Sequence, residues 1–468
     1  MIMKPTKLFC ISSAIAFQFG LSNCSENFLN QKPDLSQASP STLLDCRAML
    51  DDYSRMNASY SDHGEAAGDN YYFTDANYGN LRDVNNSAEG KDNYIWNPLG
   101  EHVGEWGRGY QVIYSANLIL GVVNNSSPSD PDYNVIKGSA LFFRAFAYYN
   151  LAQLFCKPFD VNTASSDLGI PLRLTSDFLE KSVRGSVEEV YNQIIADLKE
   201  SIDFLPIDVF VKSRPSKAAA YAALARTYLA MEDYVNAKIM ADACLKLYST
   251  LIDYNSTSVT PTTTTVRAAM TGASFSQFNA EIIFQALTTS GTLTQAAAFI
   301  HPDLYNTYEV SDCRKTVYFQ SAGGGTFVFR GNYSGFTSAA QFIGLATDEM
   351  YLIRAECYAR EGNTVLAMAD LNTLMAKRMK PPYNSRTATS ANDALVQILT
   401  ERRKELVFRT LRWTDLRRLN KDPQFAITLR RDMNTILYEP LKPNDLRYTF
   451  LIPTREVIVI TGMDQNPR

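Results

Sequence analysis

Apolar residues recur every three or four positions along two long stretches of the chain, at about 105–250 and 344–420. This spacing places them on one side of an α-helix, so both stretches predict amphipathic helices. The segment EWGRGYQVIYSANLILGVV is an example, because Trp106, Tyr110 and Ile113 are three to four residues apart. The next segment, NVIKGSALFFRAFAYYNLAQLF, is apolar on nearly all sides and predicts a buried helix.

Local signals place the ends of several predicted helices. Ser186 with Glu189 three residues later forms a capping box, which starts a helix that Pro206 ends. A further helix is expected around 43–55. The segment after Pro215 predicts two helices joined at 231–234.

Two other stretches, at about 57–100 and 253–340, are rich in Asn, Asp, Gly, Ser and Thr and predict loops. Short β-strand patterns occur in the second stretch, at 281–286 and 326–330. We interpret it as an insertion between helical blocks and not as a linker. The sequence therefore predicts a mostly α fold, with one domain over 41–468 that carries a loop-rich insertion with short strands.

The two helical stretches share a pattern at an offset of 130 residues. The matched positions are Tyr221 with Tyr351, Ala225 with Ala355, Tyr228 with Tyr358 and Ala237 with Ala367. An aromatic–small–aromatic face followed by a small residue on the returning helix resembles a tetratricopeptide hairpin, although two unrelated amphipathic hairpins are the alternative. A single hairpin cannot bury its own apolar face, so several hairpins should stack into a scaffold. The sequence leaves the pairing of the remaining helices open.

The N-terminus has the features of an export signal. Lys4 and Lys7 precede an apolar run over 8–21 that is too short to span a bilayer comfortably. A signal peptide over 1–23 would leave Cys24 as the first residue of the mature protein, where it would carry a lipid. A plain signal peptide that is cleaved nearby is the alternative.

Composition narrows the possible functions. Of the 468 residues, 46% are hydrophobic, which is enough for a large core, and the formal net charge is only −4. A nucleic-acid partner is not expected, because such proteins usually carry a strong basic excess. The 7 cysteines are widely spaced and do not suggest a disulfide framework.

Several segments in one order resemble the SusD/RagB family of outer-membrane nutrient-binding lipoproteins of Bacteroidetes. They are CSENFLNQKPD, FFRAFAYYNLAQLFCKPFD, GIPL, SVEEVYNQIIADLKESIDFLP, RPSKAAAYAALARTYLAMEDYVNA, MYLIRAECYAREGNTVLAMADLN, ERRKELVFRTLRWTDLRRL, FLIPTREV and QNP. Two places depart from the family pattern. Arg409 and Thr410 stand where the family usually has an acidic residue and Gly, and Asn23 stands where the residue before the lipidated cysteine is usually small.

The resemblance implies a cell-surface protein anchored in the outer membrane through lipidated Cys24, with 24–40 as its tether. It also implies a partner, a TonB-dependent SusC-like β-barrel transporter over which the protein lies as a lid. The implied cargo is an oligosaccharide, or a peptide in some members. Tetratricopeptide helices would form the scaffold, and the loop-rich side would hold the ligand.

Binding residues for such a cargo are expected to combine flat aromatic rings with amides and charged groups, because sugar rings have apolar faces and hydroxyl edges. The loop-rich segments supply the candidates: Asp69, Asn70, Tyr71, Tyr72, Tyr94, Trp96, Asn97, Tyr305, Tyr308 and Tyr333. The alternative, that rings such as Tyr71 and Trp96 fill the core beneath the loops, is equally compatible with the sequence.

Signs of catalysis are weak, so no enzyme activity, cofactor or metal site is predicted. The 3 histidines lack metal-ligand spacing. Asp348 and Glu349 resemble a glycosidase pair only in type, because neighbouring residues on a helix point in different directions. The functions left open are a glycan-binding or peptide-binding family member, a periplasmic tetratricopeptide adaptor for proteins, and a glycoside hydrolase.

Overall fold

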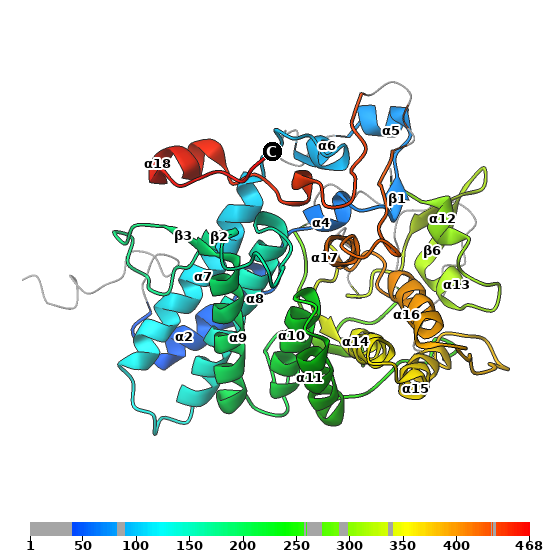
Figure 1. The fold of residues 1–468 in the computed structure, drawn as a ribbon. Coiled ribbons are helices and arrows are strands. Elements are labelled where there is room, and N and C mark those ends of the chain that lie inside the picture. Colours follow the sequence, from blue (N-terminus) through cyan, green and yellow to red (C-terminus); the bar gives the residue numbers. More distant parts are fainter. Residues whose placement is uncertain are drawn as a thin grey trace, which may run out of the picture. The chain divides into compact units, whose positions relative to one another are not determined.

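Stacked helices form the scaffold of the protein (Figure 1). The computed structural model describes residues 40–81, 89–256, 259, 274–289, 298–335, 340–431, 433 and 437–468. The scaffold helices are α7 (Val103–Asn124), α8 (Tyr133–Phe155), α9 (Val187–Phe204), α10 (Lys217–Ala230), α11 (Tyr234–Leu247), α14 (Thr347–Arg360), α15 (Thr364–Met375) and α16 (Ala391–Glu405). Each packs on the next, from α7 to α15, and α16 packs on α14 and α15. The predicted mostly α fold is confirmed.

The 130-residue repeat is confirmed and extends into the turns. Helices α10 and α14 both have 14 residues, and each is followed by a three-residue turn. The central turn residues, Glu232 and Gly362, both have a left-handed backbone, with φ of 62° and 85°. Asp233 and Asn363 then cap α11 and α15 with their side chains. Since α11 packs on α14, the two hairpins are neighbours in the stack.

Helix α8 is buried along most of its length, as predicted, and distant residues complete its C-terminal end. The last four carbonyls of a helix have no partner within the helix. Here they accept hydrogen bonds from the C-terminal part of the chain. Arg417 donates to the carbonyls of Gln153 and Cys156. The backbone amide of Phe450 donates to the carbonyl of Leu154 (2.8 Å), and the side chain of Asn466 donates to the carbonyl of Phe155 (2.9 Å).

The segments between the scaffold helices contain short elements. Near the N-terminus lie α2 (Leu43–Leu50), α3 (Tyr53–Met56), α4 (His63–Ala66), α5 (Asp75–Gly79) and α6 (Glu89–Tyr94). The prediction of a single helix at 43–55 is wrong in one respect. Asp52 caps a new helix, so the segment is divided into α2 and α3. In the stretch 57–100, where only loops were predicted, the described residues form three short helices.

Within the described residues the strands belong to three small sheets. The largest has four strands in the order β1 (Tyr71–Tyr72), β5 (Phe299–Ile300), β7 (Thr326–Phe329) and β6 (Phe319–Gly323), with α12 (Pro302–Tyr305) and α13 (Arg314–Tyr318) beside it in the chain. The two others pair β2 (Leu168–Pro171) with β3 (Arg184–Ser186), and β4 (Ile282–Phe284) with β8 (Leu345–Ala346). The strands predicted at 281–286 and 326–330 are confirmed as β4 and β7.

The C-terminal part consists of α17 (Arg412–Leu419), the short helices η1 (Leu446–Tyr448) and η2 (Thr454–Ile458), and α18 (Val459–Thr461). Among the described residues, no helix combines the length and the apolar character that a bilayer crossing demands. The cysteines within the described ranges are all buried and form no disulfide bond: Cys46, Cys156, Cys244, Cys313 and Cys357. The predicted signal peptide and Cys24 lie outside the described residues.

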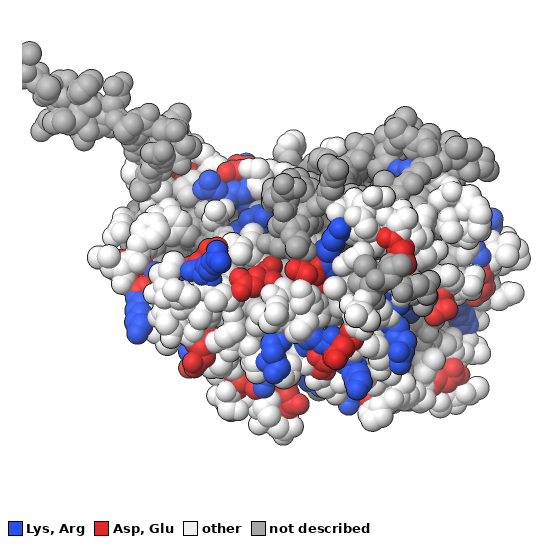
Figure 2. Space-filling view, turned by 90° about the horizontal axis from the view of Figure 1, so that it is seen from above, with Lys and Arg blue, Asp and Glu red and all other residues white. Residues whose placement is uncertain are grey.

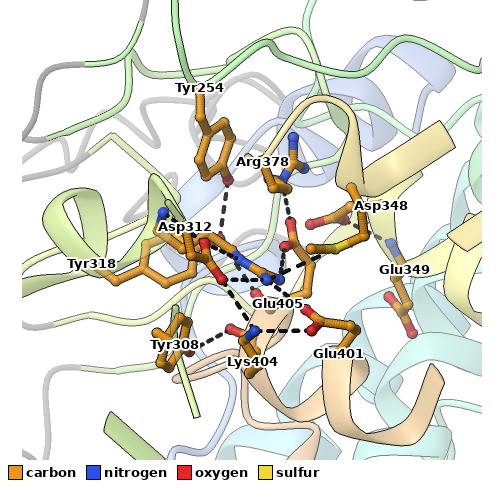
Figure 3. Close-up of polar contacts among 12 residues, drawn as sticks. Tyr254, Tyr308, Asp312, Tyr318, Asp348, Glu349, Arg378, Glu401, Lys404 and Glu405 are labelled. Carbon is orange, nitrogen blue, oxygen red and sulfur yellow. Dashed lines mark hydrogen bonds and ion pairs between the residues drawn. The ribbon is translucent and has the colours of Figure 1, made fainter. Parts of the chain in front are cut away.

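A buried network of ion pairs joins the insertion to helix α16 (Figure 3). Glu405 accepts hydrogen bonds from Arg378 (2.7 Å) and Arg314 (2.9 Å), and all three side chains are fully buried. Arg378 also bonds Glu281, which directly precedes β4 (2.7 Å). Glu401 pairs with Arg314 and with Lys404 (2.9 Å). Glu401, Lys404 and Glu405, from the segment ERRKELVFRTLRWTDLRRL, are therefore ion-paired within the protein.

Glu401 allows a test of this network at different pH values. Burial alone would raise the pKa of its carboxyl, but Arg314, Lys404 and Arg386 more than offset this and lower the pKa to about 2, from an ordinary 4.5. We expect Glu401→Gln to lower the free energy of unfolding by about 3 kcal/mol at pH 7, because Arg314 and Lys404 keep Asp312 as a partner but each lose one charged hydrogen-bond acceptor. The loss should shrink between pH 4.5 and 2, since the wild-type carboxyl also becomes protonated there.

Urea denaturation at several pH values measures this difference. The matched control is Glu200→Gln, since Glu200 is 47% exposed and pairs with Lys137. The control should change the free energy of unfolding by less than about 0.5 kcal/mol. A Glu401 effect as small as that of the control would contradict the prediction.

Thr410 allows a second test, at the position where the family usually has glycine. Phe408 and Thr410 both have a left-handed backbone, with φ of 57° and 61°. We expect Thr410→Gly to raise the free energy of unfolding by roughly 1 kcal/mol, because it relieves the strain of a β-branched residue. Phe408→Gly should instead lower it by about 3–5 kcal/mol, because the buried Phe408 ring stacks on Phe329 at 4.5 Å. Thermal and urea unfolding of both variants would check the opposite signs.

Candidate functional site

The loop after α4 carries the first predicted binding residues, and their polar groups are already paired. Asp69 accepts a hydrogen bond from Arg412 (2.6 Å) and forms an ion pair with Arg403 (3.1 Å). Burial would raise the pKa of Asp69, but these two guanidinium groups hold it well below its usual range. Asn70 is buried and donates to Glu65 (2.7 Å). Both residues therefore stabilise the loop.

Four of the predicted aromatic residues lie in the core. Each has at most 4% of its surface exposed: Tyr71, Tyr94, Tyr308 and Tyr333. Their hydroxyls are also engaged, with Ala66, Phe73, Lys404 and Glu281 respectively. The structure thus gives these four rings a packing role in place of the predicted ligand contact, because no ring face reaches the surface.

Tyr72 and Tyr305 are half-buried and lie near the four-stranded sheet. Tyr72 pairs with Phe299 across β1 and β5, with ring centroids 5.7 Å apart. Tyr305 stacks on Phe327 at 3.7 Å. Phe299 is paired with Val328, the neighbour of Phe327, and successive strand residues point to opposite faces. The two aromatic pairs therefore lie on different faces of the sheet and do not form one platform.

Trp96 and Asn97 line an open groove of about 870 Å³, which we call the Trp96 groove. Its other walls come from the segments 437–439 and 444–447 and from Arg468. In Figure 1 the helix that leads into Trp96, α6, lies beside the C-terminal end of the chain. The groove therefore brings two of the predicted residues together with a part of the chain that lies more than 300 residues later.

Trp96 is held firmly at the edge of the Trp96 groove. Its backbone is left-handed, with φ of 56°, which is strained for so large a side chain. The indole Nε1 donates to the carbonyl of Ala67 (3.0 Å), and the guanidinium of Arg431 lies 4.3 Å from the ring. Only 4% of Trp96 is exposed, so its ring offers little surface to the groove. Strain of this kind is found where the surroundings fix a residue, often at binding sites.

Tyr438 supplies the more accessible aromatic ring of the Trp96 groove. It is half-buried, and its ring lies 6.0 Å from that of Trp96. The Tyr438 hydroxyl accepts a hydrogen bond from the Arg431 amide (2.8 Å). The ring is therefore held in place while part of its surface stays in contact with solvent.

Polar side chains with fixed positions complete the Trp96 groove. Asn97 donates to Asp92 (2.7 Å), and Arg447 donates to Asp445 (2.7 Å). Arg468 donates to the carbonyl of Pro98 (2.7 Å), and burial lowers the pKa of its guanidinium to about 10. An aromatic ring beside amide, carboxylate and guanidinium groups matches the apolar faces and hydroxyl edges of a sugar.

The sequence analysis missed Tyr438, Asp445, Arg447 and Arg468. They lie in the segment YEPLKPNDLRY and at the end of the chain. This segment combines tyrosine with Asn, Asp and Arg in a loop, which is the same signal that selected the 69–97 region. It was therefore detectable, but nothing in the sequence places it opposite Trp96.

The structure offers no arrangement for hydrolysis among the candidate carboxylates. Asp348 pairs with Arg409, and Glu349 pairs with Arg226 (2.6 Å), and all of these side chains are buried. Over the described ranges, no three His, Cys, Asp or Glu side chains come together as a metal site would require. On the face seen in Figure 2, acidic and basic side chains are interspersed and wide areas are uncharged.

Two family descriptions match the chain. The one called "Starch-binding associating with outer membrane" covers residues 27–229, and the one called "SusD family" covers residues 337–468. The chain belongs to the SusD/RagB family. This family includes glycan-binding proteins and is associated with the outer membrane, so the resemblance of the sequence is confirmed.

A curated relative is the SusD-like protein P2 of Formosa agariphila, which is 32% identical over 159 residues. The match covers 34% of this chain and 29% of that protein, so the chain matches less than a third of the length of this curated relative.

Solved structures share the fold of this SusD-family chain over most of its length. A SusD superfamily protein from Bacteroides thetaiotaomicron has a TM-score of 0.71 and 21% identity, covering 91% of this chain and 100% of the other. One from Bacteroides vulgatus has a TM-score of 0.70 and 22% identity, covering 92% and 99%. A laminarin-binding SusD-like protein has a TM-score of 0.61 and 17% identity, covering 90% and 97%.

Proposed function

We propose that this protein captures a nutrient oligosaccharide at the cell surface and passes it to a TonB-dependent SusC-like transporter, without catalysing a reaction. The Trp96 groove is the main support, because it combines a half-exposed ring, Tyr438, with the fixed polar groups of Asn97, Asp445 and Arg447. Proteins recognise sugars with such a combination of flat rings and hydrogen-bonding groups.

Two further observations support a sugar ligand and a binding role. One solved structure of the same fold is described as laminarin-binding. The burial of Asp348 and Glu349 in separate ion pairs also argues against the glycoside hydrolase alternative, since hydrolysis needs two carboxyl groups that face one cleft. A peptide-binding member of the family is the second candidate.

The proposal includes attachment to the outer face of the outer membrane through lipidated Cys24, with 24–40 as the tether. The family description and the residues around Cys24 support this location. A periplasmic adaptor for proteins is the alternative. A periplasmic adaptor would share the helical scaffold, but its binding of proteins would not explain the sugar-binding chemistry of the Trp96 groove.

Binding to the Trp96 groove can be tested by blocking its mouth. Leu437 lines the groove and is 98% exposed, so Leu437→Arg fills space there without disturbing the core. We expect about tenfold weaker binding of whichever neutral glycan the wild-type protein retains, because the new side chain occupies the ligand's space. Affinity electrophoresis and calorimetry against starch, laminarin, xylan and a peptide mixture would measure it.

The matched control is Val365→Arg on α15, where the valine is 79% exposed and is not one of the residues that line the groove. The control should bind like the wild type. Equal binding by both variants would remove the Trp96 groove from the proposal, and binding of peptides alone would favour the second candidate. If the wild type bound neither class, the proposed function would be wrong.

The proposed location predicts that protease added to intact cells digests the wild-type protein. Cys24→Ser should release it from the outer-membrane fraction, because the acyl anchor would be lost. Immunoblots of protease-treated cells and of membrane fractions check both results, and a periplasmic protein of known location serves as the protected control. Protection of the wild type from protease would support the periplasmic adaptor.

A further inference from the structure

A second groove lies next to the Trp96 groove. It has a volume of about 450 Å³, and we call it the Lys157 groove. Its lining includes Lys157, Asp160, Thr163, Asp167 and Lys421.

Three residues, Asn444, Asp445 and Leu446, line both grooves. The two grooves therefore lie on either side of one short stretch of chain, which we call the ridge. A ligand that is longer than the Trp96 groove has to leave it at some point, and the ridge leads directly into another polar depression.

The ridge is rigid and its top is suitable for a sugar ring. Asn444 has a left-handed backbone, with φ of 61°, and its amide donates to the carbonyl of Asn420 (3.3 Å). Arg447 bonds both carboxylate oxygens of Asp445 and the carbonyl of Pro440 (2.9 Å). Leu446 is 41% exposed and offers an apolar contact between two polar grooves. Binding across the ridge would cost little ordering, because the ridge is already fixed.

The two grooves differ in chemistry in a way that fits successive parts of one glycan. The Trp96 groove has the half-exposed Tyr438 ring, on which a sugar face can stack. In the Lys157 groove the one aromatic side chain of the lining, Tyr448, is 2% exposed. There the polar groups are charged or hydroxyl groups, such as Lys157, whose side chain is 40% exposed, and Thr163, and the carboxylate of Asp167 accepts a hydrogen bond from each of them. Such groups bind hydroxyls, or an acidic substituent, by hydrogen bonds.

From this geometry we infer that the ligand is an oligosaccharide long enough to cross the ridge, with one end stacked in the Trp96 groove and the other hydrogen-bonded in the Lys157 groove. This inference rests on the proposed function and makes it more specific. A monosaccharide or disaccharide would occupy only the Trp96 groove.

The test uses size-fractionated oligosaccharides, from disaccharide to octasaccharide, prepared from whichever of laminarin, xylan or starch the full-length protein retains. In calorimetry the wild-type dissociation constant should fall with each added sugar until both grooves are filled, and then stay level. The double variant Lys157→Ala, Thr163→Ala should bind the long oligosaccharides about tenfold more weakly, through the loss of two hydrogen-bonding groups, and the disaccharide unchanged.

The matched control is Lys246→Ala, Thr400→Ala, which removes the same side chains from exposed positions on α11 and α16. The control should bind every length like the wild type. Affinity that does not depend on length, or an equal loss for short and long oligosaccharides in the Lys157 variant, would overturn the inference and leave the proposed function standing. Absence of any glycan binding by the wild type would overturn both.

Discussion

The buried ion pairs around Glu405 are the interaction on which the rest of the structure depends. Removing charged side chains from water is costly, and the cost is offset only when every charge has a partner in good geometry. Glu405 meets Arg378 from the segment after α15 and Arg314 from the insertion, and Arg378 in turn meets Glu281 beside β4. None of these charges can be buried until all the segments are in place. The insertion and the helical scaffold must therefore form together, and the insertion is an integral part of the core.

The same constraint explains where the many aromatic residues are used. Tyr254 lies 4.0 Å from the guanidinium of Arg378, and Tyr333 lies 3.5 Å from that of Arg409. Arg431 similarly contacts Tyr94 at 4.0 Å, next to Trp96. Rings packed on buried guanidinium groups replace part of the lost hydration through cation–π attraction. Many of the aromatic rings in the described residues therefore serve the core, while others, such as Tyr72 and Tyr438, are half-buried, and Phe178 and Phe210 are exposed.

The scaffold was predictable from the sequence because helix packing requires small residues and capping residues at regular local spacings. Ala225 and Ala355 allow close approach of helices, and Ser186 with Glu189 fixes the start of α9. The predicted strands at β4 and β7 followed from the same kind of local pattern. No such local pattern shows which loop side chains are exposed. Tyr71 and Tyr72 are adjacent and chemically identical, yet Tyr71 is buried and Tyr72 is half-buried. The pairing of β1 with β5 decides which face of the sheet each ring occupies, and this pairing cannot be read from the sequence.

Helix α8 shows how far apart the parts of one element can be in the chain. Its final carbonyls receive their hydrogen bonds from Arg417, Phe450 and Asn466, which are synthesised some 260–310 residues after the helix itself. A growing chain thus exposes this helix, which is buried along most of its length in the folded protein, with an unfinished end for most of its synthesis. Folding of this protein must wait for nearly the whole polypeptide, which makes C-terminal truncation far more damaging than the small number of removed residues suggests.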